Sequence, residues 1–192
     1  MSRNVELLNY LKKRRSVPLP FLQNPGPSES ELKEILEIAT RVPDHGKLFP
    51  WRLIIYKGTN RIKTGENLAL IAKENNPNID EEKLEVERNQ FLPAPLTIGV
   101  VSSPIKHKKI PQSEQVLSAA AVAINLVHGA NALGFGTHWV SRWFSYDQSA
   151  KKMLGAKNGE EFVAFIHIGT PCKTLEDRER PNLKDVVTYW QN

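Results

Sequence analysis

The stretch from Gln112 to Leu133 constrains the fold more than any other part of the chain. It is the longest segment with a helical pattern, and its run of small residues from Ala119 to Ala123 lets neighbouring elements approach closely. Gly134 then ends the helix. We therefore predict a long, buried helix at the centre of the fold.

Strands and further helices are dispersed around this central helix. Four segments have strand character, namely 51–57, 96–102, 136–141 and 161–170. Helices are expected over 3–15, after the capping box of Ser28 and Glu31, over 60–75, over 80–91 with Asp80 as its cap, and after a second capping box of Ser145 and Gln148. Because helices and strands do not alternate strictly, the pattern predicts an α+β fold rather than a repeated βαβ unit.

The length of 192 residues suits one domain with a short extension. We place the domain at residues 1–170 and the extension at 171–192. The extension is polar and interrupted by prolines, yet it ends in the apolar, β-prone segment Val186–Trp190. No helix follows to cover that segment.

Several classes of protein are excluded by composition. No apolar run approaches the roughly 18 residues of a membrane helix, and the N-terminus lacks the apolar core of a signal peptide, so we expect a cytoplasmic protein without a membrane partner. The single cysteine, Cys172, excludes an internal disulfide and a dithiol redox mechanism. The five histidines have no metal-site spacing, so no metal is expected. If the chain is a redox enzyme, a bound cofactor must carry the electrons.

The net charge of +5 raises the alternative of a nucleic-acid- or phosphate-binding module without redox activity. The basic residues are mostly scattered, and the only local runs are 12–15 and 106–109. Either run is equally well explained as a solvated face or as a phosphate contact. Two nucleotide motifs are absent, because Trp139 stands where GxGxxG needs its third glycine and Gly46-Lys47 lacks the rest of a P-loop.

Three short stretches carry groups suited to a ligand. The first is Arg14-Arg15-Ser16, whose guanidiniums and hydroxyl match phosphate oxygens, although plain capping of the first helix by cations explains it as well. The second runs from Arg41 to Trp51 and contains His45 in a proline-bounded loop, which is equally consistent with an ordinary connection.

The third stretch runs from Gly134 to Arg142, where glycines permit a flat ligand to approach the backbone. A helix C-cap followed by a core strand is the simpler explanation. Gly129, inside the central helix, makes room either for a ring or for a closely packed helix. Glu114 is a weaker candidate, since it belongs to the first turn of a helix, and Cys172 has no identifiable base partner.

The order of these stretches is more specific than any one of them. Arg-Arg-Ser near the N-terminus, then Arg-x-Pro-Asp-His-x-x-x-x-Pro-Trp, a Gly-Phe-Gly turn near 135 and an apolar strand ending Ile-Gly-Thr-Pro resemble the nitroreductase superfamily. The chain is most similar to its small, single-domain YdjA-like branch. The resemblance covers nearly the whole chain, including the final Val-Val-Thr-Tyr-Trp.

This resemblance implies an antiparallel-centred sheet flanked by helices, in a homodimer with two FMN sites at the subunit interface. Residues 171–192 would dock on the partner subunit, exchanging the C-terminal strand. The residues implied to bind the cofactor are Arg14, Arg15 and Ser16 at the phosphate and ribityl end, Arg41 and His45 from the other subunit, and Trp139, Val140 and Ser141 along the flavin, with Gly129 at a nicotinamide contact.

Two positions depart from the pattern of that branch. Phe49 stands where a polar residue often precedes the Pro-Trp pair, which removes one hydrogen bond to the flavin ring. Val140 stands where a basic residue often lies, and Arg142 two places later need not compensate, because it points to the opposite strand face from Ser141.

The implied activity is a ping-pong transfer of hydride from NAD(P)H through FMN to a small acceptor, such as a nitroaromatic or a quinone. No side chain needs to act as an acid or base, so no catalytic residue is predicted. A reductive dehalogenase or a flavin-using biosynthetic enzyme on the same fold fits equally well. Nucleic acid is not an expected partner under this interpretation.

Overall fold

The structure, a computed structural model, describes residues 3–191. The chain forms two compact units, one of residues 16–172 and one that combines the residues up to Arg15 with those from Lys173 onward. The N-terminal helix thus belongs with the C-terminal extension rather than with the larger unit.

A five-stranded antiparallel sheet forms the centre of the larger unit. The strands are β1 (Leu22–Gln23), β2 (Trp51–Lys57), β3 (Leu96–Ser102), β4 (Gly136–Val140) and β5 (Glu161–Pro171). β3 lies between β2 and β5, while β4 and β1 both pair with the far side of β5. The predicted antiparallel α+β fold is therefore confirmed, and β1 is the one short strand that sequence reasoning missed.

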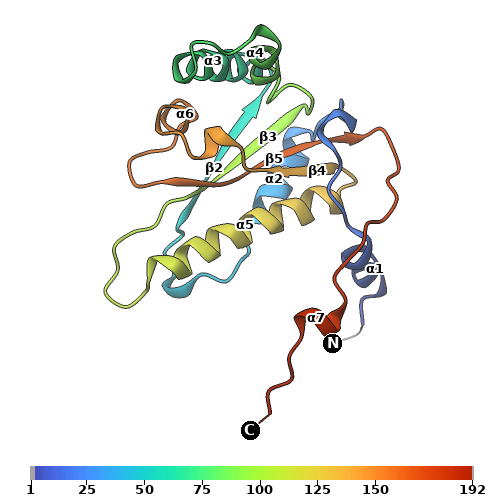
Figure 1. The fold of residues 1–192 in the computed structure, drawn as a ribbon. Coiled ribbons are helices and arrows are strands. Elements are labelled where there is room, and N and C mark those ends of the chain that lie inside the picture. The colour runs from blue at the N-terminus through green and yellow to red at the C-terminus, as the bar shows by residue number, and fades with distance from the viewer. Residues whose placement is uncertain (1–2, 192) are drawn as a thin grey trace. The chain divides into compact units, whose positions relative to one another are not determined.

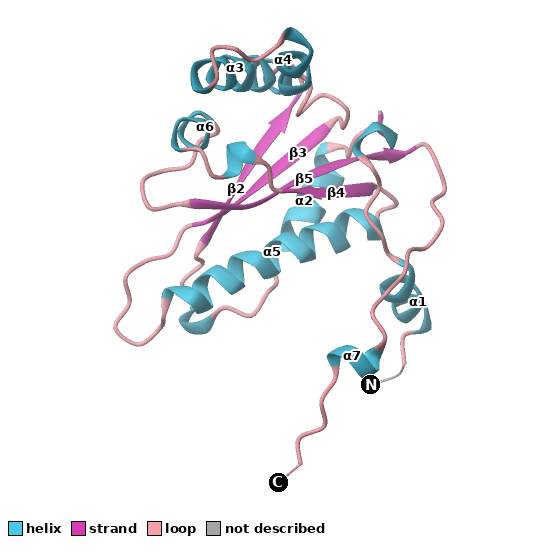
Figure 2. Cartoon of the chain, viewed as in Figure 1, coloured by secondary structure: helices cyan, strands magenta, loops and turns pink. Residues whose placement is uncertain are grey.

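Two layers of helices cover the sheet (Figures 1 and 2). One face carries α2 (Glu29–Ala39) and α5 (Gln112–Ala132), and the other carries α3 (Asn60–Asn75), α4 (Glu81–Arg88) and α6 (Gln148–Met153). Each face has its own apolar core. The first is centred on Ile98, Ile166 and Leu126, and the second is an aromatic cluster around Phe91 and Phe165.

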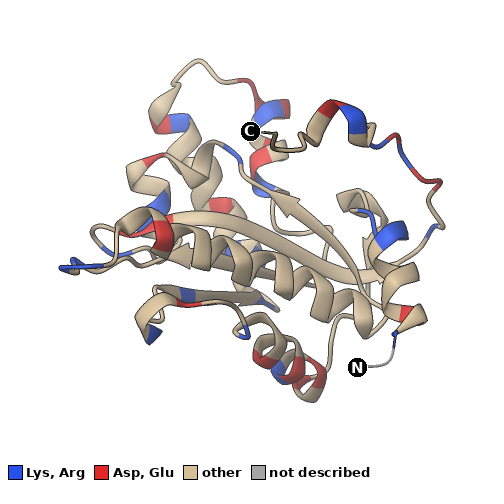
Figure 3. Ribbon diagram, turned by 90° about the horizontal axis from the view of Figure 1, so that it is seen from below, with Lys and Arg blue, Asp and Glu red and all other residues tan. Residues whose placement is uncertain are grey.

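The central helix is α5, as predicted. Ala119, Val122, Ala123 and Leu126 are fully buried. Figure 3 shows almost no charged residue along α5, and Glu114 is the single Asp, Glu, Lys or Arg in this helix. A Cβ atom at Gly129 would lie 3.2 Å from Ile38 of α2. Close packing of two helices accounts for this glycine.

The two predicted capping boxes have different outcomes. Ser28 accepts the N–H of Glu31 and the Glu31 carboxylate accepts the N–H of Ser28, so the first box is confirmed. The second is wrong, because Asp147 caps α6 and accepts the N–H of Ala150 at 2.8 Å. Ser145 already lies in the short 3-10 turn η3 (Trp143–Ser145), where its N–H is bound to the carbonyl of Arg142. A residue in helical conformation cannot serve as an N-cap.

The smaller unit contains α1 (Val5–Lys13) and α7 (Leu183–Val186). α1 ends two residues earlier than predicted, since Arg14 adopts extended backbone with φ −54° and ψ 133°. Val186 closes a helical turn rather than opening a strand, and in residues 3–191 the segment that follows pairs with no strand. A strand needs a neighbour for its N–H and C=O groups, so docking on a partner subunit stays a prediction. None of the helices described is long and apolar enough to span a bilayer.

Candidate functional site

The first motif lies at the end of α1, in the smaller unit. Because Arg14 leaves the helix, both Arg14 and Arg15 extend beyond its last turn. Arg180 donates from Nη2 to the carbonyl of Arg14 at 3.1 Å, and Arg15 donates from Nη1 to the carbonyl of Glu176. The extension therefore brings further guanidinium groups to the motif. Sequence reasoning missed Arg180, and the signal that was available is the arginine pair Arg178 and Arg180 within an otherwise polar tail.

The second motif is a strained loop held by a carboxylate. Lys47 and Phe49 have positive φ angles of 54° and 49°, which residues other than glycine rarely adopt. The Asp44 carboxylate accepts the N–H of Leu48 at 3.2 Å and that of Phe49 at 2.9 Å, and so fixes this conformation. Backbone strain of this kind gathers at ligand sites. The loop presents the Phe49 ring to solvent, with 66% of the residue exposed.

Side chains along α5 hold the second motif in place. His45 Nδ1 lies 2.8 Å from the Glu114 carboxylate, Ser118 donates to the carbonyl of Pro43 at 2.5 Å, and Asn125 donates to the carbonyl of Arg41 at 2.8 Å. Because Glu114 binds Nδ1, the Nε2 edge of His45 is left for a ligand. A cavity of about 360 Å³ opens between His45, Glu114 and Leu117.

The third motif comprises β4 and the residues that follow it. Trp139 is 38% exposed, Ser141 is exposed, and Val140 is buried against the aromatic core. The backbone and one ring of this motif are thus accessible. Gly136 has a structural cause, since a Cβ there would meet Leu22 at 2.7 Å. Gly129 is buried against α2, in contact with Ile38 rather than with a cavity.

Two histidines that the sequence analysis did not single out lie opposite each other on β4 and β5. His138 and His167 are register partners, and Thr97 Oγ1 lies 2.9 Å from His167 Nδ1. His167 is fully buried. Burial, with a smaller contribution from the charges of His138, Arg142 and Arg61, lowers the pKa of His167 to about 3. Burial also lowers the pKa of His138, and Arg142 adds to this effect. Both imidazoles are therefore neutral at pH 7.

The predicted residues fall into three groups rather than one. Arg14 and Arg15 belong to the smaller unit, Arg41 and His45 lie in the loop that α5 holds, and Trp139, Val140 and Ser141 follow one another at the end of β4. In residues 3–191 no hydrogen bond or ion pair joins the last two groups. No cluster of three or more His, Cys, Asp or Glu side chains suited to a metal occurs in that range.

Comparison with known proteins connects these groups to a family. Residues 11–170 match the sequence profile of the Nitroreductase family. The chain belongs to the nitroreductase family. It is 33% identical over 172 residues to a Haemophilus influenzae protein named "Putative NAD(P)H nitroreductase", covering 88% of this chain and 91% of that one. It is 29% identical over 190 residues to YdjA of Escherichia coli K12, named in the same way, covering 97% of this chain and 100% of YdjA.

Solved structures have the same fold. A nitroreductase-like protein from Bacillus cereus superposes with a TM-score of 0.82 at 24% identity, covering all of both chains. A nitroreductase with bound FMN from Desulfitobacterium hafniense superposes with a TM-score of 0.68 at 21% identity, again over both chains in full. The predicted resemblance and the assignment as an oxidoreductase of this family are confirmed.

Proposed function

We propose that this protein is an FMN-dependent oxidoreductase that takes hydride from NAD(P)H and reduces a small organic acceptor, such as a nitroaromatic or a quinone. The observation that carries the proposal is the match to the Nitroreductase family over residues 11–170, which spans all three motifs. The FMN in the Desulfitobacterium hafniense structure, on a fold that matches this chain throughout, supports FMN as the cofactor.

The chemistry of the first motif fits the phosphate of FMN. Arg14 and Arg15 provide planar guanidinium forks on extended backbone, which match the oxygens of a phosphate. Ser16 adds a hydroxyl near the ribityl chain. Arg180 contacts the backbone of Arg14, so we add Arg180 to the groups that hold the phosphate.

The other two motifs suit the isoalloxazine ring. Trp139, Val140 and Ser141 line it with the accessible backbone at the end of β4. Arg41 and His45 reach it from the partner subunit, with Glu114 fixing the imidazole. FMN, when bound, supplies the hydride chemistry between NAD(P)H and the acceptor. The protein binds and orients the reactants, and no side chain in these motifs is required as a nucleophile.

The surface of the chain supports a homodimer. Leu117 is 69% exposed and Val116 is 43% exposed on α5, and Phe49 lies in the loop that α5 supports. Tyr189 and Trp190 near the C-terminus are 84% and 88% exposed. Exposed apolar side chains of this size indicate a protein–protein interface. A second copy of the chain would cover them and would bring Arg41 and His45 of one subunit to the flavin of the other.

The absorption spectrum of the purified protein, together with its sedimentation, tests this proposal. We expect a yellow dimer whose flavin spectrum bleaches when NADH or NADPH is added. Losing one guanidinium from the phosphate site should weaken FMN binding roughly 10- to 150-fold, as expected for a hydrogen bond to a charged group. Arg14→Ala, Arg15→Ala and Arg180→Ala should each have this effect, measured by equilibrium dialysis.

Lys63→Ala is the matched control, since Lys63 is an exposed cation on α3. It should leave FMN affinity unchanged, and circular dichroism should report a folded protein for every variant. A colourless protein that takes up no added FMN would contradict the proposal. If the three arginine variants retained FMN as tightly as the Lys63 variant does, the phosphate assignment would be wrong.

A further inference from the structure

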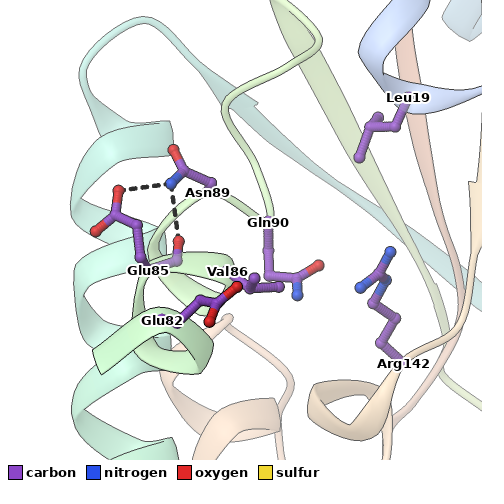
Figure 4. Close-up of a pocket in the computed structure, with 7 residues that line it drawn as sticks. All are labelled: Leu19, Glu82, Glu85, Val86, Asn89, Gln90 and Arg142. Carbon is purple, nitrogen blue, oxygen red and sulfur yellow. Dashed lines mark hydrogen bonds between the residues drawn. The ribbon is translucent and has the colours of Figure 1, made fainter. Parts of the chain in front are cut away.

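A cavity of about 450 Å³ lies beside the third motif, apart from the groups assigned above. It is lined by Leu19, Glu82, Glu85, Val86, Asn89, Gln90 and Arg142. These residues come from the short turn η1 (Leu19–Phe21), from α4 and the residues after it, and from the position directly after Ser141. In Figure 4 the amide of Gln90 and the guanidinium of Arg142 face each other across this space. We call it the Arg142 pocket.

Arg142 is the one cation in the pocket lining, and its donors are free. Within residues 3–191 its guanidinium makes no hydrogen bond and no ion pair. Two carboxylates, Glu82 and Glu85, form an acidic wall of the pocket. Glu85 is already paired, because its carboxylate accepts from Arg88 at 3.0 Å and from Asn89 at 2.7 Å. Glu82 has no such partner in the part of the chain described. A guanidinium with free donors in a cavity is suited to a carboxylate, which it can bind through two parallel hydrogen bonds.

Outside the pocket lining, several nitrogen atoms in the region that the charge of Arg142 reaches have no hydrogen-bond partner in the described part of the chain. His167 is fully buried, and its Nε2 has no hydrogen-bond partner among the residues described. The same holds for His138 Nδ1 and Arg61 Nε. Arg142 lowers the pKa of both histidines, so its charge reaches this group. An anion bound at Arg142 would supply the ion-pair partner that this guanidinium lacks among the residues described.

The remaining walls define the rest of the ligand. Leu19 and Val86 provide apolar surface, which suits an aromatic ring. Glu82 stands on the acidic wall and disfavours a second negative charge there. The pocket therefore combines a site for one carboxylate with space for a flat apolar body. Ser141 and Arg142 both lie beyond the end of β4 at Val140, where strand alternation no longer applies, so the pocket opens next to the residues that we assign to the flavin edge.

We propose that the Arg142 pocket binds the electron acceptor and selects a planar aromatic acceptor that carries a single carboxylate, paired with Arg142. This inference rests on the proposed function and names the substrate class for the same site. With a nitro group as the reducible part, the reaction is Ar–NO₂ + NAD(P)H + H⁺ → Ar–NO + NAD(P)⁺ + H₂O. One N–O bond of the acceptor breaks, its oxygen leaves as water, and NAD(P)H supplies both electrons.

Steady-state kinetics of the FMN-loaded dimer with two matched acceptors test the proposal. The acceptors are 4-nitrobenzoate and its neutral methyl ester. The wild-type protein should have a higher kcat/KM for the carboxylate. Arg142→Met should lower kcat/KM for 4-nitrobenzoate about 10-fold or more, because a charge-assisted hydrogen bond is lost, and should leave the methyl ester nearly unchanged. Glu82→Gln should raise kcat/KM for 4-nitrobenzoate, since it removes a negative charge from the same pocket.

Lys63→Met changes the net charge as Arg142→Met does, but on an exposed position of α3 that lines no part of the pocket. It should behave as wild type with both acceptors. A second measurement avoids turnover altogether. Benzoate cannot be reduced here, and calorimetry should record its binding to the oxidised, FMN-loaded protein, weakened about 10-fold or more by Arg142→Met.

The outcomes separate this inference from the proposed function. If the protein binds no FMN, or reduces neither acceptor, the proposed function fails, and benzoate binding still decides whether Arg142 holds a carboxylate. If the methyl ester is reduced as well as 4-nitrobenzoate and Arg142→Met affects both alike, the proposed function stands and the carboxylate selectivity is overturned. Benzoate binding that does not depend on Arg142 overturns it as well.

Discussion

Two polar clusters of the larger unit differ in how completely their groups are paired. The first joins β2 to the start of β5. Arg52 donates to both oxygens of the Glu160 carboxylate at 2.8 and 2.6 Å, and Ser103 and the N–H of Lys157 also donate to that carboxylate. Arg52 further donates to the carbonyl of Gly155 at 2.9 Å. Glu160 is nearly buried, yet its oxygens are fully satisfied.

The second cluster lies at β4 and the middle of β5, around Arg142, His138 and His167. Here Arg142 makes no ion pair, and one ring nitrogen of each histidine lacks a partner among the residues described. Both clusters contain buried ionisable side chains. In the first, the chain supplies every counter-charge and hydrogen bond, whereas in the second it leaves Arg142 and one nitrogen of each histidine unpaired within residues 3–191.

This difference separates structure from function within one sheet. A fully paired buried network stabilises the fold and specifies the register of its strands. Unpaired buried polar groups reduce stability, and they persist in native proteins where they serve a site. The Arg52 cluster is thus a structural feature, while the Arg142 cluster is where a ligand completes the set of interactions.

Arg52→Ala should have the largest effect on stability. It leaves the Glu160 carboxylate without its main partner in a nearly buried position. We expect a loss of about 3 kcal/mol, at the low end for a broken buried pair, because 33% of the Arg52 side chain is exposed. Urea denaturation measures this loss. Lys57→Ala, at the exposed end of the same strand, should cost far less, and equal losses in both variants would contradict a structural role for Arg52.

The pH dependence of stability should distinguish the two clusters. Arg52 holds the pKa of Glu160 down at about 2, below the ordinary 4.5, so its contribution is complete above pH 4.5 and is lost as the pH falls toward 2. Burial holds the pKa of His167 at about 3, below 6.5, so the unfolded chain binds more protons between these values. Stability therefore falls with decreasing pH already from 6.5, by up to about 1.4 kcal/mol per pH unit.

His167→Asn should abolish the loss of stability that begins at pH 6.5 and should keep the loss below pH 4.5 that Glu160 causes. Urea denaturation at pH 7, 6 and 5 can measure the first of these effects. Asn can still meet Thr97 through its amide. The control is His107→Asn, since His107 is exposed and binds the N–H groups of Lys109 and Ile110. If both variants kept the wild-type slope between pH 7 and 5, the acid sensitivity would come from groups other than His167.

The contrast also explains which features the sequence could predict. Strands 51–57 and 96–102 have the predicted bounds, because apolar periodicity reports burial on a local scale. The cap of α6 was wrong, since Ser145 and Asp147 both suit a cap and only the preceding turn decides between them. The Arg52–Glu160 pair spans 108 positions, and no local pattern predicts such a contact.

The same limit applies to the candidate site. Arg14, His45 and Trp139 could be proposed from the sequence because their motifs are contiguous and ordered along the chain. Arg180 and His167 were missed, because their environment arises only when distant segments meet. Arg142 was found but given no role. Its pocket needs Gln90 and Leu19, and neither is near it in the sequence.

The smallest expected effect belongs to Arg142, and it sharpens the comparison most. Arg142 is exposed and makes no hydrogen bond or ion pair within residues 3–191, so Arg142→Met should change the free energy of unfolding by no more than about 0.5 kcal/mol. The same substitution removes a positive charge that lowers the pKa of His138. We therefore expect the pKa of His138 to rise, which NMR titration of the imidazole can follow.

Lys63→Met provides the reference, because it removes one positive charge from an exposed position on α3 rather than from the end of β4. In this variant the pKa of His138 should remain as in the wild-type protein. Burial, the larger cause of the low pKa, is untouched by either variant, so the imidazole should still titrate below its ordinary 6.5. Equal His138 titrations in all three proteins would mean that Arg142 does not act on the histidine pair. A stability loss as large as that of Arg52→Ala would make Arg142 a structural residue, and the distinction between the two clusters would then no longer hold.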